Sequence, residues 1–87
     1  MKVRFNNRSY EVVFTEHARE QMLLRGLSEE DVLHVIQNGK QKAKPTKGKY
    51  WVFMHFPSRK DNLVCVAISI EPPNVIVITT LVNWSPK

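Results

Sequence analysis

The stretch TEHAREQMLLRGLSEEDVLHVIQN, residues 15–38, predicts two short helices joined at a glycine. Thr15 is typical of a helix N-cap, because its hydroxyl can accept a hydrogen bond from a backbone N–H of the first turn. Gly26 suits the left-handed residue at which many helices end. Ser28 is a second N-cap, and the acidic residues behind it favour the positive end of a helix dipole. The stretch therefore predicts a helical hairpin.

A row of polar side chains runs beside the predicted buried stripe of the first helix. Helical spacing at i, i+4 and i+8 places His17, Gln21 and Arg25 in one row, while Ala18 and Met22 form the adjacent, core-facing row. Side chains at such a boundary are partly sheltered, which is where functional sites are often built. His17 and Arg25 are therefore candidate site residues. The alternative is that His17 only packs at the edge of the core.

The rest of the sequence predicts strands on both sides of the helical hairpin, because segments rich in β-branched and aromatic residues recur there. These segments are residues 2–5, 10–13, 41–44, 50–56, 62–70 and 74–84. The linkers at 57–61 and 71–74 are too short for a crossover helix, so the last three segments should form an antiparallel meander. We therefore expect one domain, 1–87, of the α+β class, in which an N-terminal helical hairpin packs on an antiparallel β-sheet.

The faces of these strands are assigned only in part. In 62–70 the bulkier set, which we expect to face the helices, is Val64, Val66, Ile68 and Ile70. In 50–56 both faces carry large side chains, so the face that meets the helices stays open. The other face of the long strands has few charges, so either the N-terminal strands cover it or it binds a second chain. Thr79 and Thr80 place one hydroxyl on each face.

The composition is that of a globular protein. Hydrophobic residues make up 43% of the chain and charged residues 24%. No apolar run approaches the roughly 20 residues of a membrane span, and the first residues lack the apolar core of a signal peptide. Cys65 is the single cysteine, which excludes an internal disulfide. We therefore expect a cytoplasmic protein without a membrane partner.

The net charge of +5 is unevenly distributed. The segment KQKAKPTKGK, residues 40–49, holds five lysines and no acidic residue. Such a segment is often only a solvated loop, but lysines also bind phosphate backbones, because each neutralised phosphate releases counterions. A nucleic acid fits better than an anionic membrane, since neither predicted helix has a basic amphipathic face. The expected nucleic-acid-binding residues are Arg19, Lys42, Lys44, Lys47 and Lys49.

Sequence signatures of metal, nucleotide and acyl-transfer sites are missing. The His and Cys residues lack the close spacing of a zinc site, and there is neither a Gly-rich phosphate loop nor a nucleophilic-serine elbow. We therefore expect no metal and no cofactor. What remains is a cationic set with polar neighbours: His17, Arg19, Gln21, Arg25, Lys49, Tyr50, His55, Thr79 and Thr80.

This set suits metal-independent RNA cleavage, in which the ribose 2′-OH attacks the adjacent phosphorus. Histidine can accept or donate a proton near neutral pH, and Arg or Lys can stabilise the phosphoryl charge. His17 is then the expected proton-transfer residue, Arg25 the phosphate clamp, and Lys49 or His55 the second member. The alternatives are that Arg25 caps the first helix, that Lys49 is solvated and that His55 packs in the sheet.

The segment HAREQMLLRGLSEEDV, residues 17–32, resembles the signature of a bacterial family of domains of unknown function. That signature is His-Ala-x-x-x-Met-x-x-Arg-Gly-Ile/Leu-Ser-x-x-x-Val, followed by a basic or polar loop and a strand meander. Members of the family look similar to RelE- and BrnT-type toxins of the barnase–EndoU–colicin–RelE-like fold. The resemblance implies a toxin-type ribonuclease with His17 and Arg25 as functional positions and a cognate antitoxin as partner.

The sequence therefore predicts an endoribonuclease of the bacterial toxin type (RelE/BrnT-like), with His17, Arg25 and His55 as catalytic residues and RNA as substrate. The alternative is a non-catalytic module on the same scaffold, which binds nucleic acid, or binds a protein or a second copy through the apolar sheet face. The two differ in geometry. An enzyme should hold His17 and Arg25 in one concave pocket with a third polar side chain, whereas a binding module should have its basic loop beside a flat surface and His17 packed away.

Overall fold

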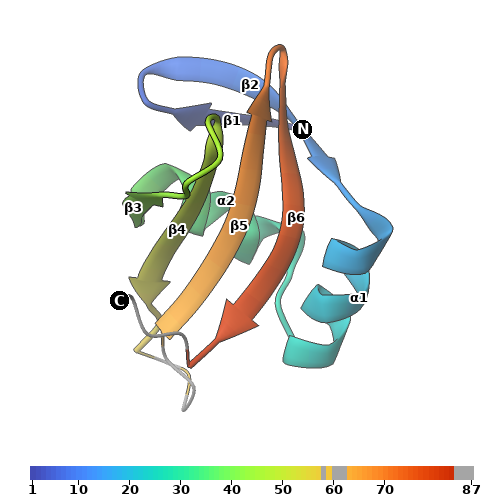
Figure 1. Ribbon diagram of the computed structural model, residues 1–87. Helices are drawn as coiled ribbons and strands as arrows, with labels where there is room; N and C mark the ends of the chain where they lie inside the picture. Colours follow the sequence, from blue (N-terminus) through green and yellow to red (C-terminus); the bar gives the residue numbers. More distant parts are fainter. Residues whose placement is uncertain (58, 60–62, 84–87) are drawn as a thin grey trace.

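The computed structural model describes residues 1–57, 59 and 63–83, and in them two helices pack on a curled sheet of six strands (Figure 1). The elements are β1 (Lys2–Phe5), β2 (Arg8–Phe14), α1 (Glu16–Arg25), α2 (Glu29–Asn38), β3 (Lys40–Ala43), β4 (Lys49–His55), β5 (Leu63–Glu71) and β6 (Asn74–Val82). The α+β class is confirmed. The helices are not N-terminal, however, because β1 and β2 precede them. Residues 58 and 60–61 of the predicted linker and the strand ends 62 and 84 lie outside the described residues.

The sheet is mixed, and the expectation of a purely antiparallel sheet is wrong. Its strand order is β1-β2-β6-β5-β4-β3. β4, β5 and β6 form the expected antiparallel meander, but β2 and β6 are parallel, with Val12 opposite Val75. The meander leaves one edge of β6 open, and β2 pairs with that edge and shields it from other chains. The segment between β2 and β6 contains both helices and is the long crossover that a parallel pair requires.

The sheet is so strongly curled that residues near its two edges contact each other. Asn6 and Asn7 form the β1–β2 turn with φ values of 51° and 66°, which Asn tolerates and which match the twist of a tight hairpin. Gln41 on β3 donates from Nε2 to the Oδ1 of Asn6 at 2.6 Å. The rings of Phe5 and Tyr50 lie edge to face with centroids 5.3 Å apart. The first and last strands of the sheet are thereby linked.

Both helices begin and end where the sequence predicts. The Thr15 hydroxyl accepts from the Ala18 N–H at 3.0 Å, and Gly26 ends α1 in the left-handed conformation with φ 66°. Ser28 and Asp31 exchange the two hydrogen bonds of a capping box, at 2.9 and 3.0 Å. The helical hairpin is therefore confirmed. Neither of these two described helices is long and apolar enough to cross a membrane.

The core lies between the helices and one face of the sheet. α1 contacts β6, while α2 contacts β1, β4 and β5. The predicted stripe of Ala18 and Met22 on α1 is buried. Val52, Val66 and Ile68 are buried beneath the helices. The core-facing side of β4, which the sequence left open, is therefore the side of Val52.

We call the face of the sheet that points away from the helices the outer face. Alternate strand residues point to opposite faces, and directly paired residues share a face. The outer face therefore includes Lys40 and Lys42 on β3, Lys49, Trp51, Phe53 and His55 on β4, and Leu63, Cys65 and Ala67 on β5. The N-terminal strands extend the sheet beyond β6 and do not cover this face.

Candidate nucleic-acid interface

His17 and Arg25 lie at opposite ends of α1. His17 is exposed in the first turn, whereas Arg25 is half-buried at the last position of the helix. They are separated by about 12 Å along the helix axis, from the rise of an α-helix. The Nε of Arg25 donates to the backbone oxygen of Thr80 at 3.1 Å. Arg25 thereby ties the end of α1 to β6.

Of the two predicted threonines, Thr80 faces the helices and Thr79 faces away. Thr80 is fully buried and pairs with Val66, while Thr79 is half-buried and pairs with Ala67. The Thr80 hydroxyl has no hydrogen-bond partner within the described part of the chain. Arg25 contacts the strand backbone beside this hydroxyl and does not reach the hydroxyl itself.

His55 is exposed on the outer face, at the end of β4. α1 packs on β6, and β5 lies between β6 and β4. Because neighbouring strands are about 4.8 Å apart, His55 is two strand spacings from β6, on the side of the sheet away from the core. The structure therefore brings Arg25 next to Thr80 but does not bring His17, Arg25 and His55 together.

Three further predicted site residues lie on the helix side of the sheet. Arg19 donates from Nη1 to Glu29 Oε2 at 2.8 Å, and its guanidinium lies 5.1 Å from the centroid of the Phe14 ring. Gln21 is half-buried on α1. Tyr50 packs against the core. Arg19 therefore links α1 to α2 and lies apart from the lysines that were predicted to bind with it.

Basic side chains gather on the outer face along β3 and β4. The Nζ atoms of Lys42 and Lys44 lie 5.9 and 5.1 Å from the centroid of the Trp51 ring, close enough for cation–π attraction. Lys40 is exposed at the start of β3, and Lys49 is half-buried at the start of β4. We define the basic face as Lys40, Lys42, Lys44, Lys49 and Trp51. Strand alternation directs the β3 lysines to one side, so the structure unites three of the predicted nucleic-acid-binding residues.

Lys47 lies in the turn between β3 and β4. Two backbone hydrogen bonds close this turn: Lys44 N–H to the Lys49 carbonyl at 2.9 Å, and Lys49 N–H to the Thr46 carbonyl at 3.2 Å. Gly48 adopts φ 81°, which is accessible to glycine without strain. The turn therefore keeps Lys44 and Lys49 opposite each other, and Lys47 is exposed beside the basic face.

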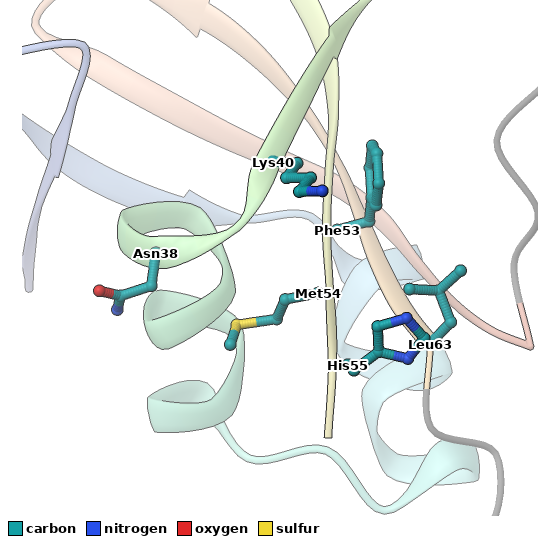
Figure 2. A pocket seen from close by; sticks show the side chains of 6 residues that line it. All are labelled: Asn38, Lys40, Phe53, Met54, His55 and Leu63. Carbon is teal, nitrogen blue, oxygen red and sulfur yellow. The ribbon is translucent and has the colours of Figure 1, made fainter. Parts of the chain in front are cut away.

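A hollow of about 410 Å³ lies at the end of the basic face where β3 begins (Figure 2). It is lined by Asn38, Lys40, Phe53, Met54, His55 and Leu63. Figure 2 shows His55 and Leu63 on one side of β4 and Met54 on the other, so the hollow extends across the strand edge. The sequence predicts only His55 of this lining as a site residue. The abrupt change from helix to strand at Gly39 is the signal that could have located the rest.

Cys65 is buried in the middle of the outer face. Burial raises the pKa of its thiol to about 12, and the Lys44 ammonium only partly opposes that shift. A thiol with so high a pKa is not a nucleophile at neutral pH. In residues 1–57, 59 and 63–83, no group of three or more His, Cys, Asp or Glu side chains is placed to hold a metal ion.

Comparison with known proteins identifies the family. Residues 14–82 match the family model described as "Domain of unknown function (DUF4258)", and because the match covers most of the chain, the protein belongs to this family. The match agrees with the resemblance of the helical hairpin to a family of domains of unknown function. It shows no link to RelE- or BrnT-type toxins. No curated protein and no solved structure matches the chain.

Proposed function

We propose that this DUF4258 domain binds single-stranded nucleic acid through its basic face. The observation that carries the proposal is the position of Lys42 and Lys44, whose ammonium groups lie 5.9 and 5.1 Å from the centre of the Trp51 ring on the outer face of the sheet. Basic grooves combined with aromatic side chains are typical of proteins that bind single strands.

The lysines of β3 form a row with a regular spacing. Lys40 and Lys42 occupy alternate positions of β3, and Lys44 comes directly after the strand ends at Ala43. Two residues of a strand advance by about 6.6 Å. These lysines can therefore contact phosphates of a nucleic acid that runs along β3.

Trp51 organises two of these lysines before any ligand binds. An ammonium near an indole ring is attracted by about 0.5–1 kcal/mol at an exposed site. Lys42 and Lys44 therefore sample fewer conformations than free lysine side chains. Less side-chain entropy is lost when a phosphate binds, so more of the electrostatic attraction appears as affinity.

The helices are unsuited to a nucleic acid duplex. Reading the major groove requires an element whose side chains reach base edges between two phosphate backbones. Acidic residues are instead spread over both helices: Glu16, Glu20, Glu29, Glu30 and Asp31. These five acids outnumber Arg19 and Arg25 on the same helices, and the net negative charge disfavours phosphates there and supports the sheet face.

Cleavage of RNA by His17 and Arg25 stays a prediction. The geometry favours binding over cleavage, because the residues predicted for catalysis lie on both sides of the sheet and the Nε of Arg25 already donates to the Thr80 carbonyl. A cognate antitoxin, a homo-oligomer and a cytoplasmic location likewise stay predictions.

Fluorescence anisotropy of a labelled oligouridylate, measured over a range of salt concentrations, tests the proposal. Removing two phosphate contacts with Lys42→Gln/Lys44→Gln should weaken binding and reduce the slope of log K against log[salt] by about 1.4. The matched control is Lys2→Gln/Arg19→Gln, which removes the same charge at exposed positions outside the basic face and should keep the slope. Equal slopes in the two variants, or no binding by the wild type, contradict the proposal. A denaturing gel of the same RNA tests cleavage in parallel.

A further inference from the structure

We propose that the hollow at the start of β3 takes one nucleobase of a bound single strand, with Lys40 on the adjoining phosphate. This inference rests on the proposed function and deepens it, because it adds a site for one whole nucleotide to a face that otherwise binds the backbone. The volume of about 410 Å³ lies within the range of about 300–1,000 Å³ that small-molecule sites occupy.

The hollow exists because β4 runs past the start of β3. In the described sheet β3 begins at Lys40, which pairs with Phe53, so the last residues of β4 extend beyond it. The chain before Lys40 turns away into α2 at Gly39, where an added Cβ would lie 2.8 Å from the Phe53 backbone oxygen. The chain is therefore close to β4 at Gly39 and separates from it within α2. This separation leaves the hollow beside Met54 and His55, with the end of α2 as its second wall.

The lining has the chemistry that recognises a base. Phe53, Met54 and Leu63 supply apolar and aromatic surface, and single-stranded RNA is commonly read by stacking and by hydrogen bonds to base edges. The Asn38 amide lies at the rim, where its Nδ2 donates to the His34 backbone oxygen at 3.0 Å, and Figure 2 shows it turned away from Phe53, His55 and Leu63. The apolar lining therefore favours stacking of a base over hydrogen bonds to its edges.

The hollow also continues the basic face. Lys40 belongs to both. Lys42 follows it on the same face of β3, and Lys44 comes directly after the end of that strand. A strand that contacts those two lysines therefore reaches Lys40 at the mouth of the hollow, where His55 is also exposed (Figure 2). None of the described lining residues is acidic. The charge favours a phosphate-bearing ligand over an extended peptide that would pair with the edge of β4.

Filling the hollow tests the inference. Leu63→Trp adds bulk inside it, and Leu81→Trp adds the same bulk to another half-buried leucine of the outer face, opposite Cys65 and outside the hollow. Stacking of one base contributes about 1–3 kcal/mol. Leu63→Trp should therefore weaken binding of an oligouridylate at least about fivefold and leave binding of an abasic ribose-phosphate oligomer unchanged. Leu81→Trp should not weaken binding of the oligouridylate in this way. Equal affinity of the wild type for base-bearing and abasic oligomers overturns the site and leaves the proposed function standing.

A titration of the wild-type protein keeps the test independent of how the variants fold. Methyl resonances of Met54 and Leu63, followed by NMR, should shift on addition of adenosine or uridine monophosphate. If the protein binds no oligonucleotide but these methyls shift with the mononucleotide, the proposed function fails and the nucleotide site stands. Methyls that stay unmoved, or that respond only to an extended peptide, overturn the site.

Discussion

Among single residues, Cys65 couples the stability of the fold to pH. Its ordinary pKa of 9.0 is raised to about 12 by burial, so the folded chain keeps a proton that the unfolded chain loses. The resulting stabilisation is complete below pH 9.0 and is lost as the pH rises toward about 12. Urea unfolding of the wild type and of Cys65→Ala should show the wild type losing up to about 1.4 kcal/mol per pH unit relative to the variant in that interval. A difference independent of pH would contradict the burial of this thiol.

Arg25 and His17 should differ sharply in what they contribute to stability. Arg25→Ala removes a partly buried, charge-assisted hydrogen bond to Thr80, which should cost about 1.5–3 kcal/mol. His17→Ala changes an exposed side chain and should alter the free energy of unfolding by no more than about 0.5 kcal/mol. Chemical denaturation of both variants measures these values. A stability loss in His17→Ala as large as that in Arg25→Ala would refute the placement of the two residues.

The structure brings three of the predicted binding residues onto one face but separates the residues predicted for catalysis. Lys42, Lys44 and Lys49 are recognisable because a run of lysines without acids has few structural uses, and strand alternation then directs them to one face. His17 and Arg25 share one row of helix α1, but helical spacing does not predict which tertiary contacts each end of that row makes. Only the tertiary structure places the Thr80 carbonyl beside Arg25.

At the scale of elements, the junction between α2 and β3 depends on Gly39. A Cβ added there would lie 2.7 Å from the Val35 backbone oxygen and 2.8 Å from that of Phe53, and backbone atoms cannot rotate away. Gly39→Ala should therefore cost about 1–3 kcal/mol and shift the Met54 methyl resonance in the adjacent hollow. Thermal unfolding and NMR measure the two effects.

Gly26→Ala is the matched control for this junction. Nothing lies within 4 Å of a Cβ added at Gly26, so its cost comes only from the left-handed φ of 66° and should be about 1–2 kcal/mol. The Met54 resonance should stay in place, because Gly26 ends the other helix. If both glycine variants move that resonance equally, Gly39 does not shape the hollow.

The elements themselves follow from local chemistry, whereas their pairing does not. N-caps at Thr15 and Ser28 determine the helix starts, and β-branched runs determine the long strands. The short segment 10–13 could pair with any open edge, so its parallel partner β6 could not be inferred. Both faces of β4 carry large apolar side chains, so alternation alone could not identify the side of Val52 as the buried one.

At the scale of the whole molecule, the curled sheet separates charge. The outer face carries Lys40, Lys42, Lys44 and Lys49, whereas five of the chain's eight acidic residues lie on the two helices, beside Arg19 and Arg25. Such an asymmetric field orients a polyanion before contact and raises its association rate, an effect that salt screens. The hydrogen bond from Gln41 to Asn6 links the two edges of the sheet and so helps to set its curvature.

The site as a whole was only half predictable. The lysine run indicates a phosphate ligand, but the hollow arises from two lengths, those of β3 and β4, and from the close approach at Gly39. Of these features, only the glycine that ends α2 leaves a signal in the sequence. The sequence therefore locates the run of lysines but not the hollow beside it.

The most direct measurement is the mapping of a bound oligouridylate by two-dimensional NMR of the uniformly ¹⁵N-labelled protein. We expect the largest shifts at the Trp51 indole and at the backbone amides of Lys42 and Lys44, with the amide of His17 and the Nε–H of Arg25 unmoved. Shifts confined to His17 and Arg25, with an unperturbed Trp51, would contradict the account and place the site on helix α1.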